Sequence, residues 1–285
     1  MSEITNTADA LAEELWNAET VYRPDLFAGK TVLVSGGGSG LGRGMALLFA
    51  RLGANVVICG RTLEKLERVV EFARAKGKKI LAVQSSIREV DEVAALFDRV
   101  HAEYGRLDLL VNNAGGQYPQ AAIDFAPKGW NAVINNNLNG TWYMMQRAAQ
   151  YWREHKKPGS IVNIVAVIER GMPGVAHTMA ARAGIVGVTR TVAIEWAPLG
   201  IRVNCLAPGL TATEGLEVYP PEAHQEFPRA NVMKRPGSVM EIAEAAVYIG
   251  GPSGSFMTGE VVTVDGGGKL WGELWTAGRP EYYKF

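Results

Sequence analysis

The stretch TVLVSGGGSGLG, residues 31–42, joins a short run of β-branched and apolar residues to a glycine-rich turn. An apolar-periodic pattern through Met45, Leu48, Phe49 and Leu52 follows it and predicts a helix. A buried strand, a glycine turn and a helix in this order direct backbone N–H groups and the positive end of the helix dipole at one place. The stretch therefore predicts a dinucleotide phosphate site at the start of an α/β fold.

Short apolar runs alternate with helical patterns along the rest of the chain. Two of these patterns, residues 89–104 and 242–250, are clearly amphipathic. The alternation predicts an α/β protein in which helices cover both faces of a parallel sheet. The expected strands are residues 31–35, 55–59, 80–85, 107–112, 160–165, 201–207 and 261–264.

Length and composition are those of one enzyme-sized globular domain. The chain has 285 residues, of which 47% are hydrophobic and 20% charged, and its formal net charge is +0. This balance does not predict binding to nucleic acid or to an anionic membrane surface. Cys59 and Cys205 fall in expected strands, which favours core thiols over a disulfide. Because the start lacks a secretory signal and no segment is apolar enough to span a membrane, we expect a cytoplasmic protein, and we expect no metal site.

Three segments stand outside the alternation of strands and helices. Residues 211–238, rich in Pro and Glu, follow the strand expected at 201–207. Ligands of open α/β sheets bind at that end of the strands, so this segment is expected to be a substrate lid; a surface excursion is the alternative. Residues 1–25 form an N-terminal extension with a short helix pattern at 8–16. Residues 269–285 form an aromatic tail that we expect to pack on the core or on a partner subunit, through Trp271, Trp275, Tyr282, Tyr283 and Phe285.

Six motifs in sequence order resemble those of the classical short-chain dehydrogenase/reductase superfamily. They are SGGGSGLG (35–42), NNAG (112–115), NLNG (137–140), GSIVNI (159–164), IRVNCLAPG (201–209) and TGEVVTVDGG (258–267). The resemblance implies a single-domain Rossmann fold over residues 26–268. This fold is a doubly wound seven-stranded parallel sheet of order 3-2-1-4-5-6-7 with helices on both faces. The resemblance also implies that the protein is a homotetramer.

Three longer segments narrow the resemblance to one branch of the superfamily. NNAGGQYP (112–119), KGWNAVINNNLNGTWYM (128–144) and HTMAARAGIVGVTRTVAIEWA (177–197) resemble peroxisomal trans-2-enoyl-CoA reductases. Bacterial citronellol/citronellal dehydrogenase-like proteins are similar to the same degree in these segments. Dienoyl-CoA reductases resemble the chain more distantly.

Cofactor preference is decided just after the second expected strand, where a carboxylate would favour NAD and an arginine NADP. The chain has Gly60 and Arg61 there and no acid. A guanidinium suits a phosphate dianion, so NADP(H) is preferred and NAD(H) remains possible. The alternative for Arg61 is that it opens the next helix in solvent. At the adenine the family often has Asp, whereas this chain has Ser86 followed by Ile87.

The resemblance implies further cofactor contacts, position by position. The glycine turn would hold the pyrophosphate, the NNAG turn would line the nicotinamide-side ribose, and the Pro-Gly turn would close over the nicotinamide. Each of these residues taken singly has an alternative as an ordinary turn residue. The implied contacts are Gly36, Gly38, Ser39, Gly40, Leu41, Gly42, Asn113, Ala114, Gly115, Arg182, Pro208, Gly209 and Thr213.

The catalytic residues of the superfamily are changed in this chain. Alignment from Ala183 and Gly184 puts Thr178 at the position of the family's Tyr and Arg182 at that of its Lys, while the family's Ser falls on Val165 or Ala166. Residues four apart share a helix face, so Thr178 and Arg182 are both expected to face the nicotinamide.

The two replacements differ in chemical competence. Arg182 retains donors for the ribose and a positive charge, whereas the threonine hydroxyl has no accessible pKa near neutrality and serves only as a hydrogen-bond donor. The resemblance implies that Asn137 anchors a proton-relay water. His177 is expected to be structural or to lie outside the pocket, and Gln117 and Tyr118 are candidates to reach it.

These residues favour a reaction that needs hydrogen-bond donors more than a strong acid. Reduction of a carbon–carbon double bond conjugated to a thioester has this character, because negative charge develops on the thioester oxygen. The first hypothesis is therefore an NADP(H)-dependent reductase of 2-enoyl thioesters, with an acyl-CoA or another medium-chain apolar compound as its substrate. The alternatives are a dehydrogenase of terpenoid or medium-chain alcohols and aldehydes, and a non-catalytic NADP(H)-binding protein.

Overall fold

Strand β1 (Thr31–Ser35) lies at the centre of the fold, and all five of its residues are buried. The computed structural model describes residues 2–218 and 229–270. In it, β1 pairs in parallel with β2 on one side and with β4 on the other. Its β-branched and aliphatic residues form a strand because both faces of the sheet are covered, so each side chain packs on a helix layer.

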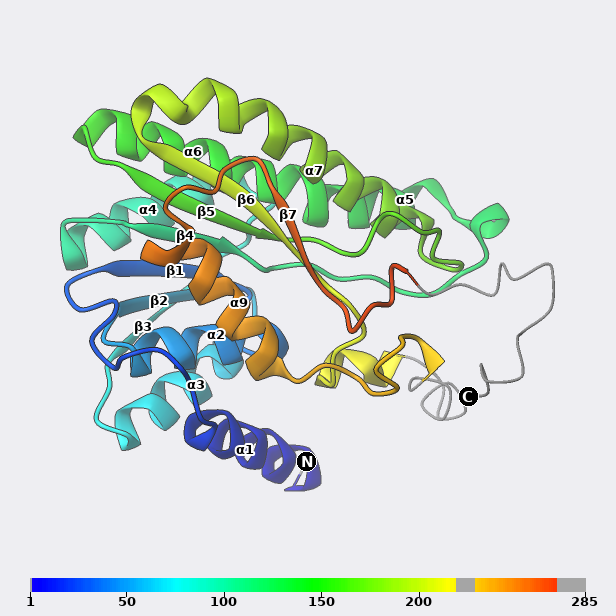
Figure 1. The fold of residues 1–285 in the computed structure, drawn as a ribbon, viewed down its shortest axis with the longest axis horizontal. Coiled ribbons are helices and arrows are strands. Elements are labelled where there is room, and N and C mark those ends of the chain that lie inside the picture. The colour runs from blue at the N-terminus through cyan, green and yellow to red at the C-terminus, as the bar shows by residue number, and fades with distance from the viewer. Residues whose placement is uncertain (1, 219–228, 271–285) are drawn as a thin grey trace.

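The sheet has seven parallel strands in the order β3-β2-β1-β4-β5-β6-β7 (Figure 1). This confirms the predicted doubly wound Rossmann fold and its strand order. Each strand lies within two residues of its predicted bounds. The remaining strands are β2 (Asn55–Gly60), β3 (Ile80–Gln84), β4 (Leu109–Asn112), β5 (Gly159–Ile164), β6 (Ile201–Pro208) and β7 (Val261–Val264).

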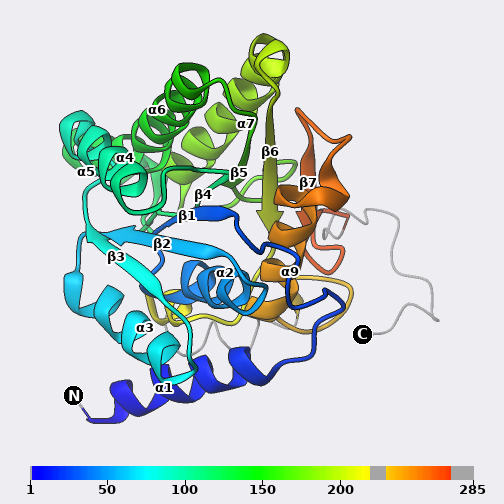
Figure 2. The same cartoon turned by 90° about the vertical axis from the view of Figure 1, so that its left-hand side faces the viewer.

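Helices cover both faces of the sheet (Figures 1 and 2). One face carries α2 (Gly40–Arg51), α3 (Leu63–Ala75) and α9 (Val239–Gly250). The other carries α4 (Val90–Tyr104), α6 (Gly140–His155) and α7 (Ala176–Trp196). The short helix α5 (Pro127–Ile134) runs into α6 through one π-helical turn, η2 (Asn135–Asn139). No helix of the described residues is long and apolar enough to cross a membrane.

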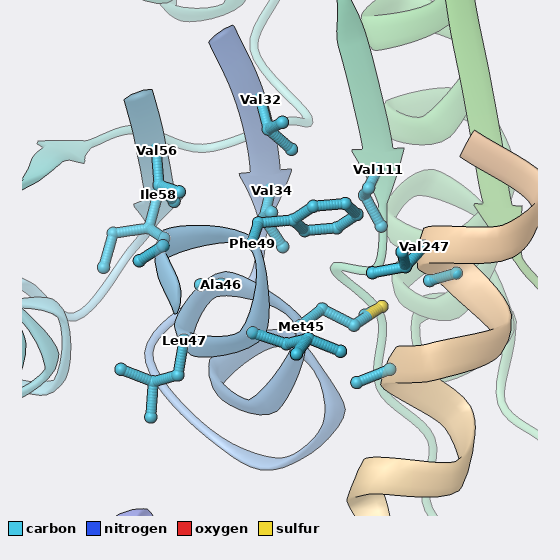
Figure 3. Close-up of a cluster of buried hydrophobic side chains, with 14 of the residues drawn as sticks. Val32, Val34, Met45, Ala46, Leu47, Phe49, Val56, Ile58, Val111 and Val247 are labelled. Carbon is cyan, nitrogen blue, oxygen red and sulfur yellow. The ribbon is translucent and has the colours of Figure 1, made fainter. Parts of the chain in front are cut away.

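The core beneath β1 is shown in Figure 3. Val32 and Val34 of β1 pack with Met45 and Phe49 of α2 and with Val247 of α9, all almost fully buried. This packing fixes the start of α2 directly under the carboxyl end of β1. The glycine-rich turn between them is therefore held in one place by the core.

The N-terminal extension contains helix α1 (Ser2–Asn17), longer than the pattern at 8–16 predicted. Ala12 and Leu15 are buried against the domain, and Arg51 of α2 donates to the carbonyl oxygens of Leu15 (3.0 Å) and Ala18 (2.8 Å). These bonds satisfy carbonyl groups at the end of α1 that the helix itself leaves unpaired.

The ends of the expected lid are tied to each other. Thr211 and Gly237 form a parallel bridge, supported by hydrogen bonds from Ala212 N to Gly237 O (2.9 Å) and from Gly237 N to Leu210 O (2.9 Å). The 3-10 turn η4 (Glu214–Val218) follows the first of these ends. The central part of the lid, 219–228, and the tail beyond residue 270, including its aromatic residues, lie outside the described residues.

Candidate active site

The glycine-rich turn closes tightly on the NNAG turn that follows β4. The hydroxyl oxygen of Ser35 accepts hydrogen bonds from the backbone N–H groups of Asn113 (3.1 Å) and Ala114 (3.0 Å). The Asn113 side chain donates to the carbonyl oxygens of Ser35 and Gly36. A Cβ at Gly42 would collide with the Gly36 carbonyl and the Asn113 amide, so only glycine allows this approach.

A cavity of about 900 Å³ opens at the carboxyl ends of the strands, beside these two turns. Most of the predicted cofactor residues lie on its wall. They are Gly36, Gly38, Ser39, Leu41, Arg61, Ile87, Asn113, Ala114, Gly115, Arg182, Pro208, Gly209 and Thr213.

Five predicted site residues are not on this wall: Gly40, Gly42, Ser86, Asn137 and Thr178. Gly42 lies inside the glycine turn, and the N–H of Gly40 donates to Oε2 of Glu214 at 3.1 Å. The N–H of Ser86 donates to Glu92 at 2.7 Å. Gly40, Gly42 and Ser86 thus lie in turns that support the cavity wall without lining it.

The wall residues fit a dinucleotide. At the start of α2 the N–H of Gly40 is bound to Glu214, whereas the Ser39 side chain makes no capping bond to the N–H groups that follow, which can therefore bind phosphates. Arg61 is joined on the wall by Thr62 and Lys65. Sequence reasoning missed these two residues. Their position in the sequence could have indicated them, because α3 begins at Leu63 and its first turn lies beside Gly38.

Arg182 is buried on the cavity wall beside Gly115. It is 7% exposed, and burial lowers the pKa of its guanidinium to about 10. Its Nη1 atom has no hydrogen-bond partner among the described residues, and a Cβ on Gly115 would overlap its Nη2 atom. A buried donor without a partner at a cavity wall is a group that a bound ligand can satisfy. The ribose hydroxyls of a dinucleotide fit this requirement.

Thr178 lies one helical turn from Arg182 on α7, and its side chain is turned toward His177. Its hydroxyl is 3.4 Å from Nδ1 of His177, which also accepts the Thr178 N–H at 2.8 Å. His177 is fully buried, packs against the rings of Tyr118 and Phe125, and has its pKa lowered by burial. Neither His177 nor Tyr118 is on the cavity wall, whereas Gln117 is.

Asn137 sits in the π-helical turn between α5 and α6 and is buried. Its amide makes two bonds to Gly116: Oδ1 accepts from the N–H (3.0 Å), and Nδ2 donates to the carbonyl oxygen (3.0 Å). The neighbouring Asn136 reaches the cavity wall and donates to Asn137 Oδ1 at 3.2 Å. Sequence reasoning did not single out Asn136, because four asparagines occur within five residues and only the π turn decides which one faces the cavity.

Both cysteines are inert core residues. Cys59 and Cys205 are buried free thiols, as expected, and burial raises the pKa of Cys59 to about 12 and that of Cys205 to about 11. Thiols with such pKa values are not nucleophiles near neutral pH.

Residues 36–269 match the model of the family described as enoyl-(acyl carrier protein) reductase. The chain belongs to this family of short-chain dehydrogenase/reductases. It is therefore an NAD(P)-dependent oxidoreductase.

Similar proteins carry several activity names. A probable 2,4-dienoyl-CoA reductase of Bacillus subtilis is 36% identical over 243 residues, which span 84% of this chain and 96% of the relative. A 3-oxoacyl-[acyl-carrier-protein] reductase of Thermotoga maritima is 34% identical over 84% of this chain and 97% of its own. The solved citronellol catabolism dehydrogenase of Pseudomonas aeruginosa is 37% identical with a TM-score of 0.78, covering 88% of this chain and 100% of that structure. These short-chain dehydrogenase/reductases share one fold and differ in substrate.

Proposed function

We propose that the protein uses NADP(H) to reduce the carbon–carbon double bond of 2-enoyl thioesters. One observation carries this proposal: the described part of the cavity wall contains Arg182 but neither a Tyr nor a His. Reduction of a ketone or aldehyde needs an acid that titrates near the working pH. Reduction of a conjugated double bond needs hydrogen-bond donors and positive charge where the thioester oxygen becomes negative.

The residues of this chain divide the work as follows. When bound, the cofactor supplies a hydride for the β carbon, and the electron pair of the double bond moves toward the thioester oxygen. Arg182 holds the nicotinamide-side ribose and places its charge near that oxygen. Thr178 donates a hydrogen bond to the oxygen after its side chain turns from His177, and Asn137 anchors the water that returns a proton to the α carbon.

The preference for NADP(H) rests on the cations at the adenosine end of the cavity. Arg61 and Lys65 both line it, and Lys65 belongs to the first turn of α3. Two cations and a helix N-terminus favour a phosphate dianion on the ribose.

The thioester proposal also agrees with two of the relatives, whose names contain CoA and acyl carrier protein. The resemblance to the citronellol catabolism dehydrogenase supports a second candidate, a dehydrogenase of medium-chain apolar alcohols or aldehydes. Val165, Met172 and Leu216 make part of the wall apolar enough for either an acyl or a terpenoid chain.

Nicotinamide absorbance separates these functions. Purified protein is mixed with NADPH and crotonyl-CoA, octenoyl-CoA or citronellal, and we expect oxidation of NADPH with the CoA thioesters. Turnover with citronellal alone would contradict the proposal in favour of the second candidate. Tight NADPH binding without turnover of any substrate would indicate a non-catalytic NADP(H)-binding protein.

A further inference from the structure

A carboxylate of the lid is bound to the start of α2, next to the cofactor cavity. Glu214 Oε2 accepts the N–H of Gly40 at 3.1 Å, and Oε1 accepts from Nη2 of Arg43 at 2.7 Å. Glu214 and Arg43 are 171 positions apart in the sequence. This contact joins the first part of the lid to the glycine-rich turn.

The Arg43–Glu214 pair is well shielded from water. The Arg43 side chain is 7% exposed and that of Glu214 29%. Nε of Arg43 is buried and has no hydrogen-bond partner among the described residues. Removal of Glu214 would leave a buried cation uncompensated, so this change is expected to cost more than the loss of an exposed ion pair.

The neighbours of Glu214 reach the cavity, although Glu214 itself does not line it. Thr213, Gly215 and Leu216 are all on the wall. A Cβ on Gly40 would lie 3.7 Å from Cβ of Thr213, so Thr213 sits directly against the glycine turn. The carboxylate of Glu214 thus anchors the chain from behind while the residues on either side face the cofactor space.

We propose that Glu214 is a positioning residue for cofactor binding, which holds Thr213 and Leu216 over the dinucleotide through its bonds to Gly40 and Arg43. The proposal rests on the use of a nicotinamide dinucleotide by the family and is independent of which substrate is reduced. Since the anchor lies at the glycine turn, it acts on the part of the cofactor that NADPH and NADH share.

The test is to measure cofactor affinity and release in Glu214→Ala. NADPH and NADH dissociation constants, from nicotinamide fluorescence, are expected to rise about tenfold, and by the same factor for both cofactors. Stopped-flow displacement should show that the rise comes from faster dissociation. Glu214→Gln, whose amide oxygen can still accept from Gly40, is expected to show a smaller loss.

A double variant separates positioning from general destabilisation. Because Glu214 acts partly through Thr213, the loss of NADPH affinity in Glu214→Ala combined with Thr213→Val should be smaller than the sum of the losses in the two single variants. Glu195→Gln, at an exposed position of α7, is the control for loss of an acid and should bind NADPH as the wild type does. Unchanged or tighter NADPH binding in Glu214→Ala, or additive losses in the double variant, would overturn the proposal.

Discussion

Gly115 shows how closely one residue controls the site. Its missing side chain makes room for the guanidinium of Arg182, which a Cβ would overlap. Gly115→Ala is therefore expected to displace Arg182 from the cavity wall and to lower kcat/KM about 100-fold, as loss of a charge-stabilising donor does. Steady-state kinetics with NADPH and an active enoyl thioester measure the effect.

Gly116→Ala is the matched control for Gly115→Ala. The nearest atom to a Cβ on Gly116 is Nδ2 of Asn136, at 3.9 Å, which is an ordinary contact. Both backbone bonds to Asn137 are retained in this variant. Equal losses in the two variants would show that the turn as a whole, and not the room for Arg182, limits activity.

Thr178 and Arg182 are expected to contribute unequally to catalysis. Arg182 is on the cavity wall and Thr178 is turned toward His177, so Arg182→Met should reduce kcat about 100-fold and Thr178→Val only about tenfold. The controls are Arg190→Met and Thr191→Val, at exposed positions of the same helix. Full activity of Thr178→Val would remove the hydroxyl from the mechanism.

Arg61 is the residue that separates the two nicotinamide cofactors. Arg61→Ala should raise the KM for NADPH about tenfold, because one phosphate contact is lost, and leave the KM for NADH unchanged. Arg74→Ala, an exposed cation at the end of α3, serves as the control. If Arg61→Ala raises both KM values equally, Arg61 does not bind the ribose phosphate.

Single elements were predictable from the sequence where local patterns decide them. The run at 31–35 is fully buried and has the predicted bounds, whereas the strand expected at 107–112 begins two residues later, at Leu109. The preceding residue, Asp108, accepts the N–H of Thr31 with its carboxylate. The orientation of Thr178 and the Arg43–Glu214 pair were beyond such patterns. The Arg43–Glu214 pair depends on a contact between distant segments. The orientation of Thr178 depends on a side-chain rotamer that helix spacing alone does not determine.

Helix α9, which follows the segment 211–238, has its start fixed by a capping box. Ser238 Oγ accepts the N–H of Glu241 at 3.1 Å, and Glu241 Oε2 accepts the N–H of Ser238 at 2.7 Å. Ser238→Ala should lower the free energy of unfolding by about 1 kcal/mol. Urea unfolding followed by circular dichroism measures the change. Ser253→Ala, an exposed serine beyond α9, should show no comparable loss.

The carboxylate of the same capping box, Glu241, makes the free energy of unfolding depend on pH. The bond from Arg235, aided by that from Ser238, lowers the pKa of Glu241 from 4.5 to about 2. A carboxyl whose pKa is lower in the folded state stabilises the fold above its unfolded pKa. This contribution is therefore complete above about pH 4.5 and is lost as the pH falls toward 2. Glu241→Gln should lack this part of the acid-induced loss, and identical pH profiles for the variant and the wild type would contradict the assignment.

At the scale of the whole molecule, α1 packs on the domain although it precedes the residues that match the family, and we expect it to unfold together with the domain. Leu15 is 5% exposed, and Trp16 packs edge-on against Phe72 of α3 with ring centroids 6.0 Å apart. Leu15→Ala should lower the free energy of unfolding by about 2–4 kcal/mol, through lost burial and the cavity that remains. Glu14→Ala, at an exposed position of α1, should change it by less than about 0.5 kcal/mol.

The decisive measurement for α1 is whether thermal unfolding stays a single transition. If α1 belongs to the core around α2 and α3, Leu15→Ala lowers one melting temperature for the entire domain. Its NADPH affinity should stay at the wild-type value, because Leu15 is not on the cavity wall. An unchanged melting temperature, or a separate early transition with the main one unmoved, would show instead that α1 is an independent appendage whose contacts add nothing to the domain.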